Sequence, residues 1–257
     1  MVAMLDAILS GTHVETYYEE IVNTATHGFG IISAVCCFYI LLLVISLHPK
    51  RSFYSGIGGI VFGLALLAVF SISTFYHSLG IIGSVWKDAM QKLDHCVIYI
   101  VIAGTYTPIV TIIVMERGGH KGLGTFVLAV EWISAAIGIF TKLFIPINQI
   151  PPVLSYGFYL FMGWAVVLVA KPALNITPWP VFKWCLIGGI SYSTGIAFIV
   201  FDSLHFNHGI WHIFVYFGAM SHFIAVLLAL TDNPDVKSLY SNLHGLLTEA
   251  KIKQKVH

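Results

Sequence analysis

The stretch FYSGIGGIVFGLALLAVFSISTFYHSL, residues 53–79, decides the fold class, because its 27 residues include no Asp, Glu, Lys or Arg. A bilayer core of about 30 Å is crossed by roughly 20 mostly apolar residues in an α-helix. Comparable apolar runs lie on both sides of this stretch. The predicted membrane spans are 24–46, 53–79, 94–115, 122–141, 151–170, 181–201 and 209–231. We therefore predict an all-α fold, a seven-transmembrane helix bundle.

The composition supports a membrane protein. Of the 257 residues, 58% are hydrophobic and 10% are charged, whereas soluble domains have about 45–50% and about 25%. The net charge of +1 offers no basic surface, which excludes a nucleic-acid partner. The chain divides into an N-terminal polar segment (1–23), a membrane domain with the candidate metal site (24–231) and a polar C-terminal tail (232–257). We expect an integral multi-pass protein of the plasma membrane.

Counting the crossings places several polar side chains at one membrane face. With seven spans, the first, third and seventh begin on the side that holds Met1, and the second ends there. We call this side the near face. The polar residues at those four span ends are Glu20, Asn23 and His27, then Ser73 and His77, then Asp94 and His95, then His208 and His212. Residues capable of chemistry from four spans are therefore expected to converge.

The histidines in this group suggest a metal site. His208 and His212 are four residues apart, on one face of a helix, and this spacing suits two ligands of one zinc ion. The alternative for this pair is a polar helix end at the membrane surface. His77 offers a third imidazole, with Ser73 one turn deeper on the same face. Three His ligands leave a fourth position for water, as in catalytic zinc sites, where zinc lowers the pKa of that water to about 7.

Asp94 is the candidate general base. A carboxylate near an activated water can accept its proton, and Asp94 begins the third predicted span. The alternative is an ordinary acidic residue at a helix N-terminus, where the helix dipole favours a negative charge. The sequence leaves both interpretations open.

Several of these residues belong to motifs that resemble the hemolysin III family, within the progestin and adipoQ receptor superfamily. The motifs, in chain order, are Glu20-x-x-Asn23-x-x-Thr26-His27-Gly28, Ser73-x-x-Tyr76-His77, Lys92-Leu93-Asp94-His95, AGTYTP at 103–108, and His208-x-x-x-His212 with His222-Phe223. The resemblance implies seven helices and a zinc ion held by His77, His208 and His212. It also places Asp94 and Ser73 at the zinc-bound water.

The resemblance also implies two functions. Distant relatives, the alkaline ceramidases and the adiponectin receptors, imply zinc-dependent hydrolysis of a long-chain lipid amide such as ceramide, with membrane lipids as partners. The bacterial members are named for haemolysis, which implies a membrane-disrupting role. The alternative is therefore a non-catalytic lipid-sensing or membrane-active protein with a structural zinc.

Two further polar residues lie within the predicted spans. His222 is ten residues beyond His212, about 15 Å along the helix, so it cannot share the metal, and we expect a buried, hydrogen-bonded histidine. An intramembrane carboxylate such as Glu131 is a functional-site candidate by default. The alternative is a protonated Glu131 bonded to a neighbouring helix. His27 and His95 are expected to contact the ligands or the interface rather than the metal.

The glycines of the second span have two interpretations. Gly56, Gly58, Gly59 and Gly63 leave room for acyl tails inside the bundle, or they permit close packing of neighbouring helices. The first interpretation places a lipid chain along the span that ends at His77. The second places it elsewhere in the bundle.

The orientation in the membrane also stays open at this point. Three of the 13 basic residues, Lys87, Lys92 and Lys142, are on the near side. The positive-inside rule then places the opposite face in the cytoplasm. The family resemblance implies a cytoplasmic N-terminus, and we adopt that orientation as the working expectation.

Overall fold

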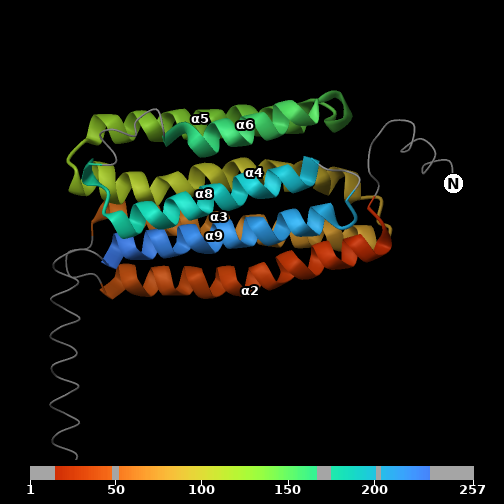
Figure 1. Ribbon diagram of the computed structural model, residues 1–257, viewed down its shortest axis with the longest axis horizontal. Helices are drawn as coiled ribbons and strands as arrows, with labels where there is room; N and C mark the ends of the chain where they lie inside the picture. The colour runs from red at the N-terminus through yellow and green to blue at the C-terminus, as the bar shows by residue number, and fades with distance from the viewer. Residues whose placement is uncertain (1–14, 48–51, 167–174, 201–203, 232–257) are drawn as a thin grey trace, which may run out of the picture.

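The computed structural model describes residues 15–47, 52–166, 175–200 and 204–231, and every regular element in these ranges is a helix. Figure 1 shows the elements in chain order. They are α2 (Tyr17–Leu47), α3 (Phe53–Ile81), α4 (Lys87–Ile109) with the π-helical η1 (Val110–Arg117), α5 (Lys121–Phe144), the 3-10 turn η2 (Ile147–Gln149), α6 (Pro152–Trp164), α8 (Trp179–Val200) and α9 (Asn207–Thr231). The predicted all-α class is confirmed.

Six of these helices are long and apolar enough to cross a membrane: α2, α3, α4 with η1, α5, α8 and α9. The 25 residues of α9 extend about 37 Å, which exceeds a bilayer core of about 30 Å. The span expected at 151–170 is described only in part, because α6 ends at Trp164 and 167–174 lie outside the described residues. The count of seven spans therefore stays a prediction. Residues 1–14 and the predicted tail 232–257 also lie outside the described residues.

Two helices begin well before their apolar runs. α2 starts at Tyr17 and α4 at Lys87, whereas the hydropathy pattern begins at residues 24 and 94. The difference arises because hydropathy marks the apolar part of a helix, while polar residues continue the same helix at the membrane surface. Asp94 is consequently two turns inside α4 and buried, so its interpretation as an ordinary helix N-terminus is wrong.

A capping box fixes the start of α2 and ties it to α9. The Thr16 amide donates to Glu19 Oε2 at 2.8 Å, and the Glu19 amide donates to Thr16 Oγ1 at 3.3 Å, which is the reciprocal pattern of a helix N-terminus. The other oxygen of Glu19 accepts the Phe206 amide at 3.2 Å, directly before α9 begins at Asn207. The first turns of α2 and α9 are thereby held side by side.

The helices lie nearly along one common direction, with α5 and α6 as a pair along one side (Figure 1). α2 packs against α3 and α9, α8 packs against α9, and α4 lies against α3 and α5. The starts of α2, α4 and α9 and the end of α3 gather at the right-hand end of the view in Figure 1. This arrangement confirms that the four span ends share one face, the near face.

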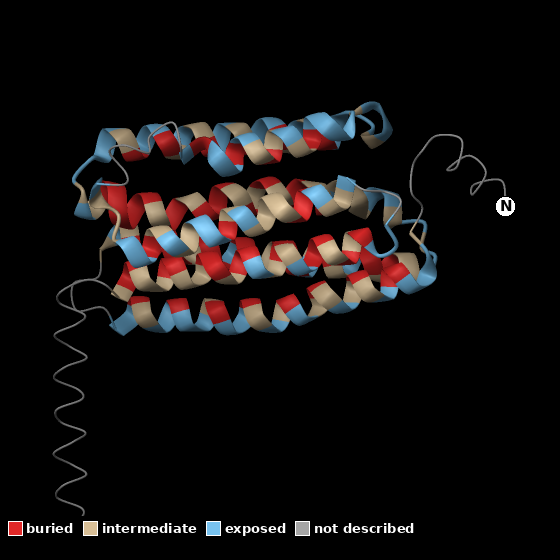
Figure 2. Cartoon of the chain, viewed as in Figure 1, coloured by how far each residue is buried: buried red, intermediate tan, exposed pale blue. Residues whose placement is uncertain are grey.

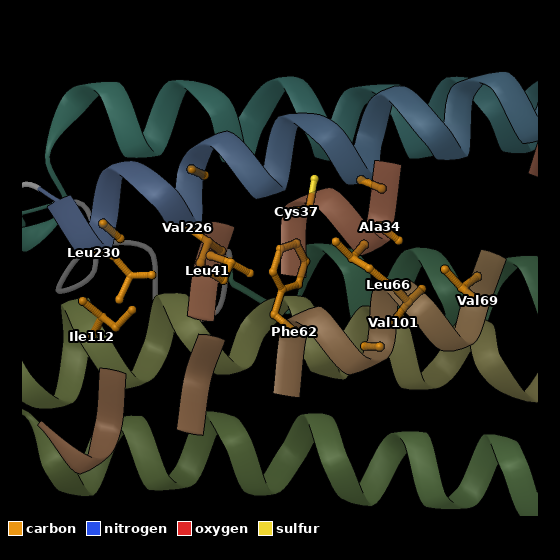
Figure 3. Packing of buried hydrophobic residues seen from close by; sticks show 14 of the residues in the cluster. Ala34, Cys37, Leu41, Phe62, Leu66, Val69, Val101, Ile112, Val226 and Leu230 are labelled. Carbon is orange, nitrogen blue, oxygen red and sulfur yellow. The ribbon is translucent and has the colours of Figure 1, made fainter. Parts of the chain in front are cut away.

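Apolar side chains from α2, α3, α4 and α9 form the core. Leu41, Phe62, Leu66, Val101 and Leu230 are buried there, and Figure 3 shows them interdigitating between the helices. Figure 2 shows buried positions facing neighbouring helices and exposed positions along the outside of the bundle. Because lipid is as apolar as these side chains, close packing rather than water exclusion holds such helices together.

The glycines of α3 illustrate this packing. A Cβ added at Gly58 would lie 2.6 Å from Thr111 Oγ1, and one added at Gly63 would overlap the Phe38 ring. A Cβ at Gly59 would lie 2.5 Å from Ile45 Cδ1. Gly58, Gly59 and Gly63 therefore allow close approach of neighbouring elements, which is the packing interpretation, whereas a Cβ added at Gly56 would meet no atom within 4 Å.

Candidate metal centre

Three imidazoles meet at the near face. His77 comes from the last turns of α3, and His208 and His212 come from the first turns of α9. One ring nitrogen of each lies within 4.8 Å of the others, and the ring centroids are 4.6 to 5.0 Å apart. His77 and His212 are buried and His208 is half-buried. The three predicted ligands are thus brought together in an arrangement that could hold a metal ion.

The other ring nitrogen of each histidine has its own partner. Nδ1 of His77 lies 2.7 Å from Glu20 Oε2, Nδ1 of His208 lies 2.5 Å from Glu15 Oε1, and Nδ1 of His212 lies 3.2 Å from Thr26 Oγ1. An ionised carboxylate only accepts hydrogen bonds, so Nδ1 of His77 and of His208 carries the proton. In the neutral ring, Nε2 is then left with a free lone pair.

This arrangement passes a test for a metal site. His77 Nε2 is buried and has no hydrogen-bond partner among the described residues. A buried nitrogen without a partner is costly, and a metal ion would remove that cost. Metal-binding histidines almost always donate their second nitrogen to a carboxylate or another acceptor, which fixes the ring orientation. The donor set therefore fits a metal.

The three acceptors are themselves held in place. Asn23 Nδ2 donates to Glu15 Oε2 at 2.6 Å, and Lys87 forms an ion pair with the second oxygen of Glu20. The Thr26 hydroxyl lies 2.9 Å from the Val22 carbonyl. Because its proton is directed to that carbonyl, its oxygen is free to accept from His212. One segment, 15–26, thus orients ligands that come from two other helices.

The environment of Glu15 keeps it ionised. Burial by itself would raise its pKa, but the hydrogen bond from His208 acts in the opposite direction. The net result is a pKa of Glu15 below its usual value. The carboxylate is therefore available as an acceptor at neutral pH.

Gly80 makes room for the other carboxylate. It lies three residues beyond His77 on α3, and a Cβ added there would overlap the Glu20 carboxyl group. Any larger residue at this position would push Glu20 away from His77. The absence of a side chain at Gly80 is thus part of the geometry of the centre.

His27 lies against the cluster without joining it. Its ring stacks on that of His212, with centroids 3.6 Å apart and planes 17° apart. Neither of its nitrogens has a hydrogen-bond partner among the described residues, and the ligand cluster does not include it. The structure therefore agrees with a contact role for His27.

The two predicted catalytic residues lie beside the ligands. Ser73, one turn before His77, is 2% exposed, and Asp94 is 7% exposed. The Asp94 carboxylate is within electrostatic range of both Ser73 and His208. Ser73 Oγ makes no hydrogen bond of normal geometry with any described residue. The Ser73 hydroxyl and the Asp94 carboxylate therefore lie next to the imidazole cluster.

The centre opens into a large, mainly apolar cavity. Its volume is about 1350 Å³, above the roughly 300–1,000 Å³ of ordinary small-molecule pockets. Asp94, His208 and His212 line its near end, and Val114 and Leu123 line its far end. Its walls come chiefly from α4, α6, α8 and α9. The cavity thus runs from the metal ligands toward the opposite membrane face, away from the glycines of α3.

The other two intramembrane polar residues have distinct settings. His222 Nδ1 donates to the Gly218 carbonyl at 2.9 Å, and its ring stacks on Tyr192, which confirms a buried, hydrogen-bonded histidine. Glu131 is 1% exposed, and its Oε2 has no hydrogen-bond partner among the described residues. The expected bond from this carboxyl oxygen to a neighbouring helix is therefore not found.

The sequence analysis missed two features of this region. It did not assign Glu15 or Thr26 to the ligands, because their contacts with α9 join residues 193 and 186 positions apart in the chain. It also ended the fourth predicted span at residue 141, directly before Lys142, whereas the structure buries Lys142 inside α5 with its Nζ 2.7 Å from Ser155 Oγ. A hydropathy pattern ends a predicted membrane span at a lysine, so it could not predict a lysine that is buried within a span.

The chain is similar to known proteins over most of its length. The profile of the family described as "Haemolysin-III related" matches residues 15–223, which includes every residue of the metal centre. The chain is 34% identical over 220 residues to the "Hemolysin-3 homolog" of Bacillus subtilis, covering 85% of this chain and 98% of that protein. It is 36% identical over 213 residues to "Hemolysin-3" of Bacillus cereus, covering 81% and 90%. It is also 29% identical over 235 residues to the human "Monocyte to macrophage differentiation factor", covering 88% and 90%.

Proposed function

The chain belongs to the haemolysin-III related family, and on that premise we propose that it is a membrane-embedded, zinc-dependent hydrolase of a lipid amide. One observation carries the proposal. Three imidazoles with oriented rings form one cluster. Two of them, His208 and His212, line the polar end of a mainly apolar cavity together with Asp94 and Ser73. The site would act on lipids of the membrane in which the helices lie, which we propose is the plasma membrane.

Zinc fits this donor set better than a hard cation. Imidazole nitrogen suits zinc, whereas magnesium and calcium prefer oxygen ligands. Three protein ligands leave one position for water or substrate, which is typical of catalytic rather than structural zinc sites. A bound zinc ion would supply a Lewis acid that polarises a carbonyl and acidifies water.

The remaining chemistry belongs to residues of the chain. Amide hydrolysis breaks the C–N bond, adds a hydroxyl to the acyl carbon and delivers a proton to the leaving nitrogen. Asp94 would take the proton from the attacking water and pass it to that nitrogen. Ser73, within range of Asp94, would orient the carboxylate or the water by a hydrogen bond.

The cavity supports a long-chain substrate. Below the polar end, its walls include Val101, Ile102, Leu160 and Val215, which would contact an acyl chain by van der Waals packing. Such a chain leaves the bilayer for a similarly apolar environment, so little free energy changes on entry and the headgroup decides the position. The amide would then lie at the near face, at the depth of the imidazoles.

Fatty acid release tests the proposal. Zinc-loaded protein in detergent is incubated with a long-chain ceramide, and free fatty acid is measured. Removing a general base typically reduces turnover by about 10²- to 10⁴-fold, so Asp94→Ala should lose release while keeping its zinc. Asp88→Ala removes an exposed carboxylate of the same helix and serves as the control.

A negative result has a defined meaning. If the zinc-loaded wild-type chain releases no fatty acid from ceramide or from a total lipid extract, the hydrolase proposal fails. The cavity then favours the other class of function, a lipid-sensing or membrane-active protein with a structural zinc. Equal turnover in Asp94→Ala and wild type would reject the role of Asp94 alone.

A further inference from the structure

Lys142 is a buried cation inside a membrane helix. It lies two residues before the end of α5 and is 3% exposed. Its Nζ donates to Ser155 Oγ of α6 at 2.7 Å, and Ser155 is buried too. Charged side chains within membrane spans are costly and usually functional. The pair therefore calls for an explanation beyond packing.

No anion of the described chain compensates this charge. Among the described residues, no ion pair includes Lys142. Of the carboxylates at the near face, Glu15 and Glu20 are bonded to His208 and His77, and Asp94 lines the same cavity without an ion pair to Lys142 among the described residues. An ammonium group has three donors, and the serine hydroxyl takes one. A buried charge is normally paired, so an external anion is the missing partner.

The surroundings of Lys142 and Ser155 are suited to binding such an anion. Lys142 and Ser155 both line the cavity, together with His95 and Lys92. Lys92 Nζ donates to the Leu143 carbonyl at 3.1 Å, so a second ammonium lies at the end of α5, beside the backbone of the residue that follows Lys142. Both lysines lie near the end of α5 at the near face, where the headgroups of a bilayer lie. Below them the same cavity is apolar.

We propose that Lys142 and Ser155, with Lys92 beside them, bind the phosphate of a phospholipid whose acyl chains enter the cavity. Two ammonium groups and a hydroxyl match a phosphate, which presents several acceptor oxygens to more than one donor. The site uses residues of α4, α5 and α6 and needs no metal, so it stands whether or not the hydrolase proposal holds.

A favourable interaction with the helix dipole does not replace this anion. A lysine in the last turn of a helix is stabilised by the negative end of the dipole, and Lys142 has this position. Yet exposed lysines gain the same interaction while their charge stays in water. The dipole explains the position of Lys142 along α5 but not its burial against the cavity.

The test compares two lipids with the same acyl chains, one with a phosphate-containing headgroup and one without a phosphate. The purified full chain in detergent is mixed with dioleoylphosphatidylglycerol or with dioleoylglycerol, and bound lipid is counted by native mass spectrometry. Wild type should retain the phospholipid, and Lys142→Gln should weaken its retention roughly tenfold or more, as expected for a lost charged hydrogen bond. Dioleoylglycerol should bind both proteins equally and weakly.

Further variants keep the result interpretable. Ser155→Ala should weaken phospholipid retention less, and Lys142→Arg should keep most of it. Lys183→Gln removes an exposed lysine of α8 and should change nothing. Thermal unfolding and metal content report whether each variant is folded. If Lys142→Gln does not fold, the proposal is tested by phospholipid retention in Ser155→Ala and by the headgroup comparison on wild type.

Three results would overturn the proposal. In the first, wild type and folded Lys142→Gln retain phosphatidylglycerol equally. In the second, wild type binds dioleoylglycerol as well as phosphatidylglycerol, so the phosphate contributes nothing. In the third, oleate or inorganic phosphate stabilises the protein in a Lys142-dependent manner and phospholipid does not, so the anion is a carboxylate or a free ion.

Discussion

His77 Nδ1 and Glu20 Oε2 lie 2.7 Å apart although one residue ends α3 and the other begins α2. The same segment before and within α2 supplies Glu15 to His208 and Thr26 to His212. The helix that supplies none of the ligands therefore sets the orientation of all three. This relationship makes the N-terminal part of the bundle a component of the metal centre.

Replacing Glu20 should weaken metal binding without removing a ligand. Glu20→Leu removes the acceptor of His77 Nδ1 and the partner of Lys87, whereas Glu20→Gln keeps an acceptor oxygen. Loss of such a partner typically reduces metal affinity about 10- to 100-fold, so we expect the Leu variant to lose more than the Gln variant. Zinc competition with a chelator measures both.

Glu116→Leu is the matched control for this series. Glu116 accepts a hydrogen bond from Ser52 at the opposite face and has no contact with the centre. It should leave zinc affinity unchanged. Wild-type affinity in Glu20→Leu would show that Glu20 does not orient His77.

A bulky side chain in the cavity wall should block the lipid and spare the metal. Ile102 of α4 lines the cavity, and Ile102→Trp would fill part of it. We expect reduced lipid retention and reduced fatty acid release with the zinc content unchanged. Ile133→Trp places the same ring on an exposed position of α5 and should leave both unaffected. Undiminished release by Ile102→Trp would locate the acyl chain outside this cavity.

Glu131 is expected to be independent of the centre. It does not line the cavity or join the ligand cluster, and its Oε2 has no partner among the described residues. Glu131→Gln keeps the shape and removes any charge, so zinc content and turnover should persist and the unfolding temperature should not fall. A zinc-loaded Glu131→Gln protein without turnover would instead assign Glu131 to the reaction.

The sequence predicted the helical class and the convergence of His77, Asp94, His208 and His212, because hydropathy and the parity of crossings depend only on local composition. It could not predict that Asp94 lies two turns inside α4, since polar residues extend a helix beyond its apolar run. It also assigned the α3 glycines to a lipid cavity as one alternative. Only the packing of Gly58 on Thr111 and of Gly63 on Phe38 decides between the alternatives.

The partners of the ligands were beyond the sequence for another reason. A contact such as Glu15 with His208 depends on how two distant helices are placed, and neither residue carries a local pattern that signals the other. Lys142 shows the same limit, because burial of a lysine depends on the helix that packs over it. Both the Glu15–His208 contact and the burial of Lys142 depend on how helices distant in the sequence pack together.

Zinc content of the His208→Ala, His212→Ala double variant tests the central claim most directly. Purified wild-type protein, analysed by elemental mass spectrometry, should contain about one zinc per chain, as a single three-histidine site would bind. The double variant should contain almost none, while His222→Ala, a change of a buried histidine on the same helix, should keep it. A double variant that is folded and retains its full zinc would contradict the assignment of the centre.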